Sequence, residues 1–334
     1  MKTRSIAILC AALTLPAIST LLADTHAFIW SSDAGMSDIG SLGGPTTIAR
    51  AINDSGQVVG ISDLADNMGS HAFIWTEANG MVDLGTAGGS YSIAFDVNSS
   101  GAVTGTTSLA SGIQVGFYWS ESTGMVALPQ SGPNQSEGLG INDSNQITGE
   151  GYAGLLSDKA FIWDFNSNIT RALGNLTGAI WNSGTAINSL GRITGPAGFP
   201  NGTYHVFLWR REDGMHDLGT PPGVTRPFPT SINDQNEIVG FSNESPVVAF
   251  YFRRSIGFRI LPTLAGGSTV GQKINNLGNI AGFSLLPATV AYHAVLWNDS
   301  LSAAQDLGTL PGDTSSQANG VNNLGQVVGS SSSP

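Results

Sequence analysis

The chain of 334 residues contains one cysteine, Cys10, and that residue lies in the N-terminal segment discussed next. The rest of the chain therefore cannot form intramolecular disulfides, bind zinc through thiolates or use a thiol nucleophile. Charged residues are also scarce, at 11% of the chain against about 25% in an ordinary soluble domain. Hydrophobic residues make up 41%, which excludes a disordered chain and allows a large core.

The first 23 residues have the pattern of a secretory signal peptide. Lys2 and Arg4 precede an apolar run that ends in small residues at Ala23, so we expect cleavage before Asp24. The alternative, a membrane anchor, is less favoured because Pro16 interrupts the run and no charged stop follows it. We therefore expect an exported protein, secreted, extracellular or periplasmic, that consists of residues 1–23 as signal peptide and residues 24–334 as one domain.

The charge and hydropathy of residues 24–334 limit the kinds of partner that we expect for the exported protein. Removal of Lys2 and Arg4 leaves 11 basic against 24 acidic residues, a net charge of −13. A nucleic-acid partner is disfavoured by this balance. No segment after the signal is long and apolar enough to span a bilayer, so we expect no integral membrane segment after cleavage. Composition makes no prediction of the oligomeric state.

The mature chain is built from internal repeats. The pentapeptide HAFIW begins at His26 and again at His71, and variants of it recur to the end of the chain. An asparagine that follows a short apolar segment, here called the register asparagine, marks each copy. The register asparagines of copies 1 to 7 are Asn53, Asn98, Asn142, Asn188, Asn233, Asn275 and Asn322. Repetition at about 45 residues indicates a propeller, solenoid or array.

Each copy reads as four short β-strands bounded by Gly, Asn, Asp or Ser, with no segment of helical period. Three residues after each register asparagine, the chain has only glycine or asparagine, which enter the left-handed region at low cost. These residues are Gly56, Gly101, Asn145, Gly191, Asn236, Gly278 and Gly325. The pattern predicts a hairpin turn with a left-handed third position. We expect each register asparagine to cap its own turn through its side chain.

A bulky ring also recurs once per copy, at the end of the first strand. The residues are Trp30, Trp75, Trp119, Trp163, Trp209, Phe252 and Trp297. Such a ring is expected to fill the space between adjacent sheets. The sequence therefore predicts an all-β fold, a seven-bladed β-propeller of four-stranded antiparallel blades with about 45 residues per repeat. A β-solenoid is the alternative, but its coils are usually shorter than these copies.

The segments HAFIW, GMVDLGTAGG and AINDSGQVVG resemble the HAF repeat of bacterial extracellular repeat proteins. The resemblance covers the mature chain. It is specific in copies 1, 2 and 7 and looser in copies 3 to 6, where GFYW, KAFIW, HVFLW and AFYF replace the signature. It implies an envelope or secreted protein, and it brings no catalytic residues with it.

No motif of known catalytic mechanism is present, so the sequence predicts no catalytic residue, no metal and no cofactor. Four of the five histidines open the first strand of a copy, namely His26, His71, His205 and His293. Three of them would belong to neighbouring blades of a closed ring, where a metal site is conceivable. A histidine that bonds to a neighbouring loop of the repeat is the favoured interpretation.

The position seven residues before each register asparagine, here called the variable position, indicates a binding site. Copies 2 to 5 place Tyr91, Gln135, Trp181 and Arg226 there, whereas copies 1, 6 and 7 have Thr or Ser. Trp181 is the only one of seven tryptophans outside the repeated Trp position. Aromatic, amide and guanidinium groups suit a carbohydrate. The competing interpretation is a variable loop that packs locally.

A second candidate site consists of paired arginines after the first strand in copies 5 and 6. These are Arg210, Arg211, Arg253 and Arg254. Four guanidinium groups on neighbouring blades could engage a polyanion. Solvated surface charge is the simpler explanation.

Three functions remain open. The favoured one is a non-enzymatic binding or adhesion propeller that recognises a glycan or another component of the cell envelope or surface. The first alternative is a polysaccharide-acting enzyme, a lyase or glycosidase, with its site on the face that carries the variable loops. The second is a structural module of a larger extracellular assembly. Binding is favoured because the polar departures from the repeat are spread over four copies instead of concentrated in one.

Overall fold

The structure is a computed structural model that describes residues 24–65, 68–129, 135–151, 158–264, 267–287, 290–298 and 301–333. The predicted signal peptide, residues 1–23 with Cys10, lies outside the described residues. Regular secondary structure in the described ranges consists of β-strands. These ranges hold no helix with the length and apolarity that crossing a bilayer requires.

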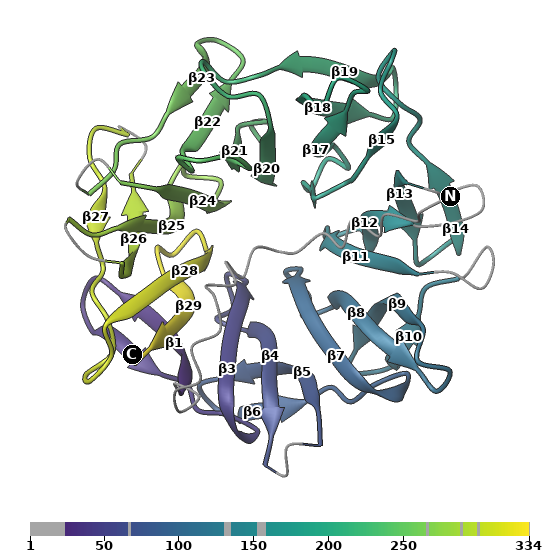
Figure 1. Cartoon of the computed structure of the whole chain (residues 1–334). Coiled ribbons are helices and arrows are strands. Elements are labelled where there is room, and N and C mark those ends of the chain that lie inside the picture. Colours follow the sequence, from purple (N-terminus) through teal and green to yellow (C-terminus); the bar gives the residue numbers. More distant parts are fainter. Residues whose placement is uncertain are drawn as a thin grey trace.

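The strands fall into four classes by their place in each antiparallel run. The innermost strands, which begin each run and most of which lie toward the centre of Figure 1, are β3 (Gly43–Ile52), β7 (Gly88–Val97), β11 (Ser136–Ile141), β15 (Trp181–Asn182) with β16 (Ala186–Ile187), β20 (Pro227–Ile232), β24 (Thr269–Ile274) and β28 (Ser315–Val321). The second strands are β4 (Val58–Leu64), β8 (Val103–Leu109), β12 (Gln146–Gly151), β17 (Ile193–Gly198), β21 (Ile238–Ser242), β25 (Ile280–Leu285) and β29 (Val327–Ser332). The third strands are β1 (Thr25–Ser31), β5 (Ser70–Thr76), β9 (Gln114–Ser120), β13 (Lys159–Asp164), β18 (Tyr204–Arg210), β22 (Ala249–Arg253) and β26 (Tyr292–Trp297). The outermost strands are β2 (Gly35–Asp38), β6 (Gly80–Asp83), β10 (Gly124–Ala127), β14 (Ile169–Ala172), β19 (Gly214–Gly219), β23 (Gly257–Ile260) and β27 (Gln305–Asp306).

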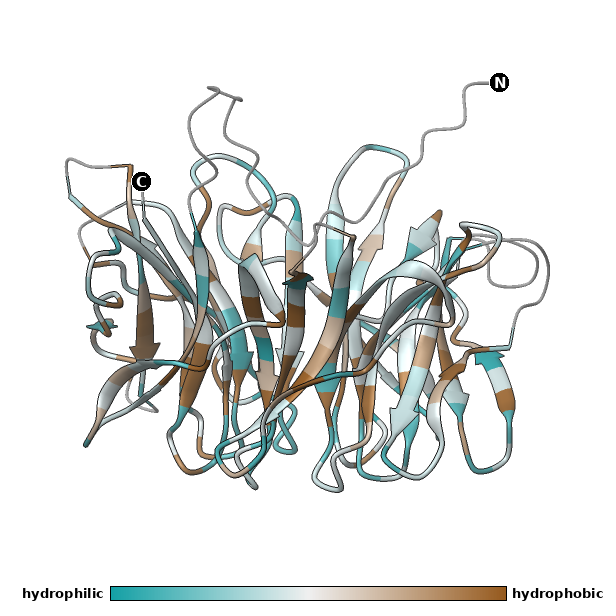
Figure 2. Cartoon of the chain, turned by 90° about the horizontal axis from the view of Figure 1, so that it is seen from below, coloured by the Kyte–Doolittle hydropathy of each residue, from teal (hydrophilic) through white to brown (hydrophobic). Residues whose placement is uncertain are grey.

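The antiparallel runs stand around a common axis (Figure 1), and the strands extend between two faces that carry the loops (Figure 2). The two ends of the chain share one run, because β1 pairs with β29 from Thr25 opposite Ser332 to Trp30 opposite Val327. A sheet therefore combines the second half of one sequence copy with the first half of the next copy. This pairing ties the start of the repeat array to its end.

The sheets are not all separate, which differs from the simple expectation of isolated four-stranded blades. Thr25 pairs with Thr46 in parallel, and Ser70 pairs with Tyr91 in the same way. These one-residue parallel pairs join three runs into a single mixed sheet of 12 strands. They arise because the first residue of a third strand lies beside the variable position of the neighbouring innermost strand.

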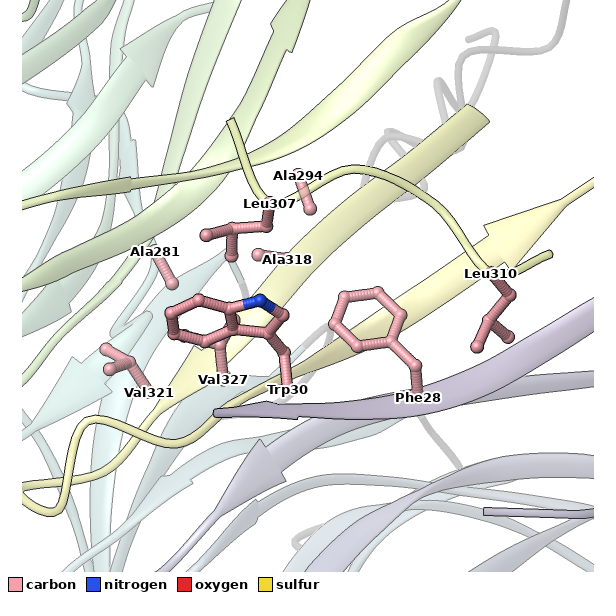
Figure 3. Close-up of a cluster of buried hydrophobic side chains, with 9 residues drawn as sticks. All are labelled: Phe28, Trp30, Ala281, Ala294, Leu307, Leu310, Ala318, Val321 and Val327. Carbon is pink, nitrogen blue, oxygen red and sulfur yellow. The ribbon is translucent and has the colours of Figure 1, made fainter. Parts of the chain in front are cut away.

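The repeated aromatic residues fill the space between adjacent sheets. Trp30 and Phe28 of β1 pack against Ala281, Ala294 and Leu307 of the neighbouring run (Figure 3). The equivalent Trp297 is fully buried in a cluster with residues of β21 and β22. Burying such rings removes a large apolar area from water. The predicted role of the repeated Trp position is therefore confirmed.

A closed ring of hydrogen bonds links the register asparagines. The side-chain amide of each register asparagine donates to the backbone carbonyl of the register asparagine in the next copy. The first of these bonds joins Asn53 to Asn98 at 2.9 Å, and the sixth joins Asn275 to Asn322 at 2.8 Å. Asn322 then donates to the carbonyl of Asn53 at 3.0 Å, which closes the ring. The side-chain oxygen of each asparagine accepts from the amides two and four residues later, as in Asn98 with Ser100 and Ala102. The predicted cap is confirmed, and the same side chain also joins neighbouring sheets.

The two asparagines among the turn residues take part in this ring. All seven turn residues have positive φ, including Asn145 at 57° and Asn236 at 61°. Where a glutamine or glutamate follows the register asparagine by four residues, its side-chain oxygen accepts from the asparagine amide, as Gln57 does from Asn53 at 2.7 Å. Asn98 is followed by Ala102, and its amide donates instead to Asn145 of the next copy at 3.0 Å. Asn236 supplies the same acceptor to Asn188.

Replacement of one ring member tests how strongly the ring holds the sheets. Asn98→Ala removes a buried side chain that accepts two backbone amides and donates to Asn142 and Asn145. Each buried group left without a partner costs about 1–3 kcal/mol, so we expect the free energy of unfolding to fall by at least about 2 kcal/mol. Urea denaturation of the variant measures this loss. The exposed Ser99→Ala in the same turn is the control, because only the backbone amide of Ser99 takes part in a hydrogen bond, to Asp143. Equal stabilities of the two variants would contradict the role of the ring.

The turn conformation is tested at Gly325, whose φ is 77° and beside which a Cβ atom would have open space. Gly325→Val should destabilise the protein by about 1–3 kcal/mol because a β-branched residue is strained at positive φ. Gly325→Asn should be nearly neutral, since Asn145 and Asn236 occupy the equivalent positions. Thermal unfolding of both variants gives the comparison, and a valine variant as stable as the asparagine variant would refute the left-handed requirement.

Candidate functional site

Trp181 lies in an aromatic cluster with Tyr204 and Arg226. The sequence pointed to Trp181 and Arg226 but not to Tyr204. Trp181 of β15 lies opposite Gly198 of β17, which in turn lies opposite Tyr204 of β18. A Cβ atom at Gly198 would fall 2.0 Å from the indole nitrogen of Trp181. The glycine therefore leaves the room in which the two rings meet edge to face, with centroids 5.0 Å apart and planes at 84°. Trp181 keeps part of its surface exposed and belongs to none of the buried core clusters of the described residues.

Arg226 joins this cluster from the adjacent sheet. Its guanidinium carbon lies 5.9 Å from the centre of the Tyr204 ring, a cation–π distance. Its Nε donates to the carbonyl of Gly202 at 3.0 Å. Glu244 accepts from the amide and hydroxyl of Thr225, both at 2.6 Å. We call Trp181, Tyr204 and Arg226 the aromatic cluster.

Glu244 brings a negative charge to the edge of the aromatic cluster. Slight desolvation opposes ionisation, but the hydrogen bonds from Thr225 and the charge of Arg226 hold the pKa of Glu244 below its ordinary value. The carboxylate is therefore ionised at neutral pH. The cluster and its edge thus carry one guanidinium and one carboxylate, with no excess of either sign.

The four predicted residues of the variable position are not gathered into one contact. Trp181 and Arg226 both contact Tyr204. Tyr91 lies on β7 beside Ser70, and its backbone accepts from Thr107 and Ser108. Gln135 is exposed just before β11. Whether Tyr91 and Gln135 share a ligand with the aromatic cluster stays a prediction.

The four arginines proposed as an anion site divide into two paired and two exposed residues. Arg210 forms an ion pair with Asp213 and contacts His216. Arg253 forms an ion pair with Glu237, a buried carboxylate that also accepts from the hydroxyl of Tyr251. Arg211 and Arg254 are exposed. The inner arginine of each pair thus stabilises its own sheet, which leaves the outer two for any anion.

The histidines at the start of the third strands bond within their own repeat. Nδ1 of His71 lies 2.9 Å from Asp83, and His205 and His293 make the same contact with Asp217 and Asp306. His26 lies 3.4 Å from Asp38. Across the ranges that the structure describes, no group of three or more His, Cys, Asp or Glu residues is arranged to hold a metal ion. The favoured interpretation as histidines of the repeat framework agrees with these contacts, although the partner is an aspartate of the same copy.

Comparison with known proteins shows the fold. No protein-family model and no curated protein matches this sequence. A protein assigned as TolB from Agrobacterium tumefaciens superposes with a TM-score of 0.54 at 11% identity, over 94% of this chain and 99% of that one. An oligogalacturonate lyase from Vibrio parahaemolyticus gives a TM-score of 0.50 at 10% identity, over 94% and 98%. The fold is a β-propeller. TolB from Acinetobacter baumannii gives a TM-score of 0.47 at 13% identity over 71% of this chain, which spans 63% of that protein.

Two carboxyl groups of this propeller escaped the sequence analysis. Glu137 and Glu150 are directly opposed on β11 and β12. Burial raises the pKa of Glu137 to about 7 and that of Glu150 to about 8, and for Glu150 the neighbouring charges of Glu137 and Asp158 add to the effect. Oε2 of Glu150 is buried without a hydrogen-bond partner among the described residues. Near pH 7, Glu150 is therefore mostly protonated, whereas Glu137 is about half protonated.

Sequence signals for the missed residues exist in the repeat alignment. Tyr204 and Tyr292 stand directly before the third strand's histidine, where copies 1 to 3 have Thr25, Ser70 and Gln114. Gly198 is one of 44 glycines in the chain, so the sequence does not single it out. Only the pairing of the three strands that carry Trp181, Gly198 and Tyr204 shows why the aromatic cluster needs a glycine there. Glu137 and Glu150 are 13 residues apart in the chain, and an antiparallel register brings them together.

The carboxyl pair makes stability depend on pH. A carboxyl whose pKa is higher in the folded state binds more protons folded than unfolded, so the free energy of unfolding falls as the pH rises. The window runs from about pH 4.5, the unfolded value, to the folded values of about 7 and 8. Each carboxyl contributes a slope of up to about 1.4 kcal/mol per pH unit in that window. Glu150→Gln should make the decline between pH 5 and 8 shallower in urea denaturation. The exposed Glu121→Gln should keep the original slope, and a Glu150→Gln slope equal to it would contradict the assignment.

Proposed function

We propose that this chain is a seven-bladed propeller of the HAF-repeat type, exported from a bacterial cell, that binds a glycan or another envelope component without catalysis. The observation that carries the proposal is the aromatic cluster of Trp181, Tyr204 and Arg226. Trp181 is partly exposed, lies outside the repeated Trp position and belongs to none of the buried clusters of the described residues. Solvent-accessible aromatic rings on a rigid scaffold are typical of recognition sites.

The chemistry of the aromatic cluster suits a sugar. The apolar faces of pyranose rings stack on aromatic side chains, and their hydroxyls accept from guanidinium groups and donate to carboxylates. Arg226 and Glu244 supply both partners beside the two rings. Because one positive and one negative charge are present, we expect a neutral glycan to bind in preference to a polyanionic one.

Two other predicted sets extend this proposal. Tyr91 and Gln135 occupy the variable position in copies 2 and 3, and we propose that they contact a glycan longer than a disaccharide. Arg211 and Arg254 are exposed on neighbouring sheets and are proposed to contact an acidic envelope component. Arg210 and Arg253 act through the ion pairs that hold their sheets.

The enzymatic alternative has one observation in its favour, the Glu137–Glu150 pair. Raised carboxyl pKa values are a property of general acids in glycoside hydrolysis. Glu150 is only 5% exposed, however, so a polysaccharide would not reach it in this conformation. If the protein depolymerises polysaccharides and Glu150→Gln abolishes that activity, the enzymatic alternative replaces the binding proposal.

The binding proposal is tested with a glycan array followed by titration of the best neutral ligand. Trp181→Ala should weaken binding from several-fold to some tens-fold, because a stacked ring contributes about 0.5–1.5 kcal/mol beyond its buried area. Its melting temperature should change by only a few degrees. Arg226→Ala should weaken the same ligand.

Trp163→Ala is the matched control from the repeated Trp position. Trp163 is 2% exposed and packs against Tyr118 and Phe165, so its removal should cost about 3–5 kcal/mol of stability. If Trp181→Ala unfolds the protein as strongly as Trp163→Ala, Trp181 belongs to the core. Unchanged affinity of a well-folded Trp181→Ala variant for every bound glycan would place the site elsewhere.

A further inference from the structure

A cavity of about 110 Å³ lies where the innermost strands surround the axis. Each copy contributes the residue three positions before its register asparagine. These residues are Arg50, Phe95, Leu139, Thr185, Thr230, Gln272 and Asn319. In six of the seven copies the strand register shifts at this residue, so that it has no partner on the second strand. A β-bulge re-aims one side chain, and here it turns each of them toward the axis.

Three of these side chains share hydrogen bonds with the next copy around the ring. Thr185 donates to the carbonyl of Pro229 at 2.8 Å, and Thr230 donates to that of Gly271 at 2.8 Å. Asn319 donates to the carbonyl of Ala49 at 2.9 Å. Arg50 makes no such bond among the described residues.

An ion pair across the axis neutralises two of the three charged residues that line the cavity. Nζ of Lys273 on β24 lies 2.9 Å from Asp96 on β7, on the opposite side of the ring in Figure 1. Asp96 is 7% exposed and also accepts from the amide of Ile141. The two charges therefore compensate each other. Arg50 remains as the one uncompensated charge among the residues that line the cavity.

Arg50 has a hydrogen-bond donor that is not satisfied within the described residues. Its Nε is buried and has no hydrogen-bond partner among the described residues. Buried donors are nearly always satisfied, so an unpartnered guanidinium nitrogen in a cavity requires an explanation. A carboxylate fits a guanidinium because it accepts two parallel hydrogen bonds from it.

The other residues that line the cavity indicate the chemistry of the rest of the ligand. Copies 6 and 7 place the amides of Gln272 and Asn319 on the strands that precede that of Arg50 around the ring, where they can bond a carboxylate or its polar substituents. Copies 2 and 3 present Phe95 and Leu139, and Phe228 adds a third apolar side chain. The cavity thus has a side rich in hydrogen-bond donors and an apolar side.

We propose that the axial cavity binds a small organic carboxylate, with its carboxylate on the guanidinium of Arg50 and its apolar body against Phe95 and Leu139. The site is separate from the aromatic cluster, and it does not depend on the glycan proposal. In a chain of net charge −11, Arg50 gives this cavity a positive charge.

Calorimetric titration of the protein with benzoate tests the site, with benzamide and glucuronate as the neutral and the polar comparison. Benzoate should bind, benzamide should bind at least tenfold more weakly because it lacks the charge, and glucuronate should bind more weakly because it lacks an apolar body. Arg50→Ala should reduce benzoate affinity by roughly tenfold or more. Arg50→Lys should retain part of the affinity, since lysine keeps the charge without the bidentate geometry.

Two control variants separate this site from the others. Arg254→Ala removes an exposed arginine outside the cavity and should leave benzoate affinity unchanged, as should Trp181→Ala in the aromatic cluster. Melting temperatures of all variants show whether each remains folded, and Phe95→Ala provides a second cavity variant that keeps Arg50. No benzoate binding to the folded protein, or loss of binding in Arg254→Ala but not in Arg50→Ala, would overturn the proposal.

Discussion

The register asparagine is the constraint on which the rest of this propeller depends. One buried side chain satisfies two amides of its own turn and one carbonyl of the next sheet, and repetition of this geometry closes a ring. Hydrophobic contacts between sheets are non-directional and would allow them to slide. The hydrogen bonds fix the angle and height of each sheet against its neighbour, because a buried carbonyl without its donor would cost about 1–3 kcal/mol.

This constraint also organises the chemistry near the axis. The register asparagine holds one end of every innermost strand at the same height, and a bulge three residues earlier turns one side chain toward the axis. Each copy thus presents the residue three positions before its register asparagine to the axis at the same height. This residue can differ between copies while the turn at the register asparagine stays the same. Arg50 and the Asp96–Lys273 pair occupy this level, where copies with small or neutral side chains leave space for them.

The aromatic cluster uses the other end of the same strands. There the variable position lies beside the first residue of a third strand, as the pairing of Ser70 with Tyr91 shows. A binding residue at this end therefore meets a side chain from a neighbouring strand of its own copy. In copy 5 that neighbour is Tyr204, whose ring bridges Trp181 and Arg226. The same geometry in copy 2 gives Tyr91 only a serine.

The sequence alone determined the all-β class, the repeat length, the turn at every register asparagine and the packing role of the repeated Trp position. These features are local or periodic, so spacing and residue type suffice to predict them. Only the tertiary structure decided that the asparagines join in a ring, that Gly198 makes room for Trp181 to meet Tyr204, and that Asp96 bonds to Lys273 across 177 residues of chain. Contacts of this kind depend on strand register and on the angle between sheets. A one-residue change of register would turn the same side chains to the opposite face.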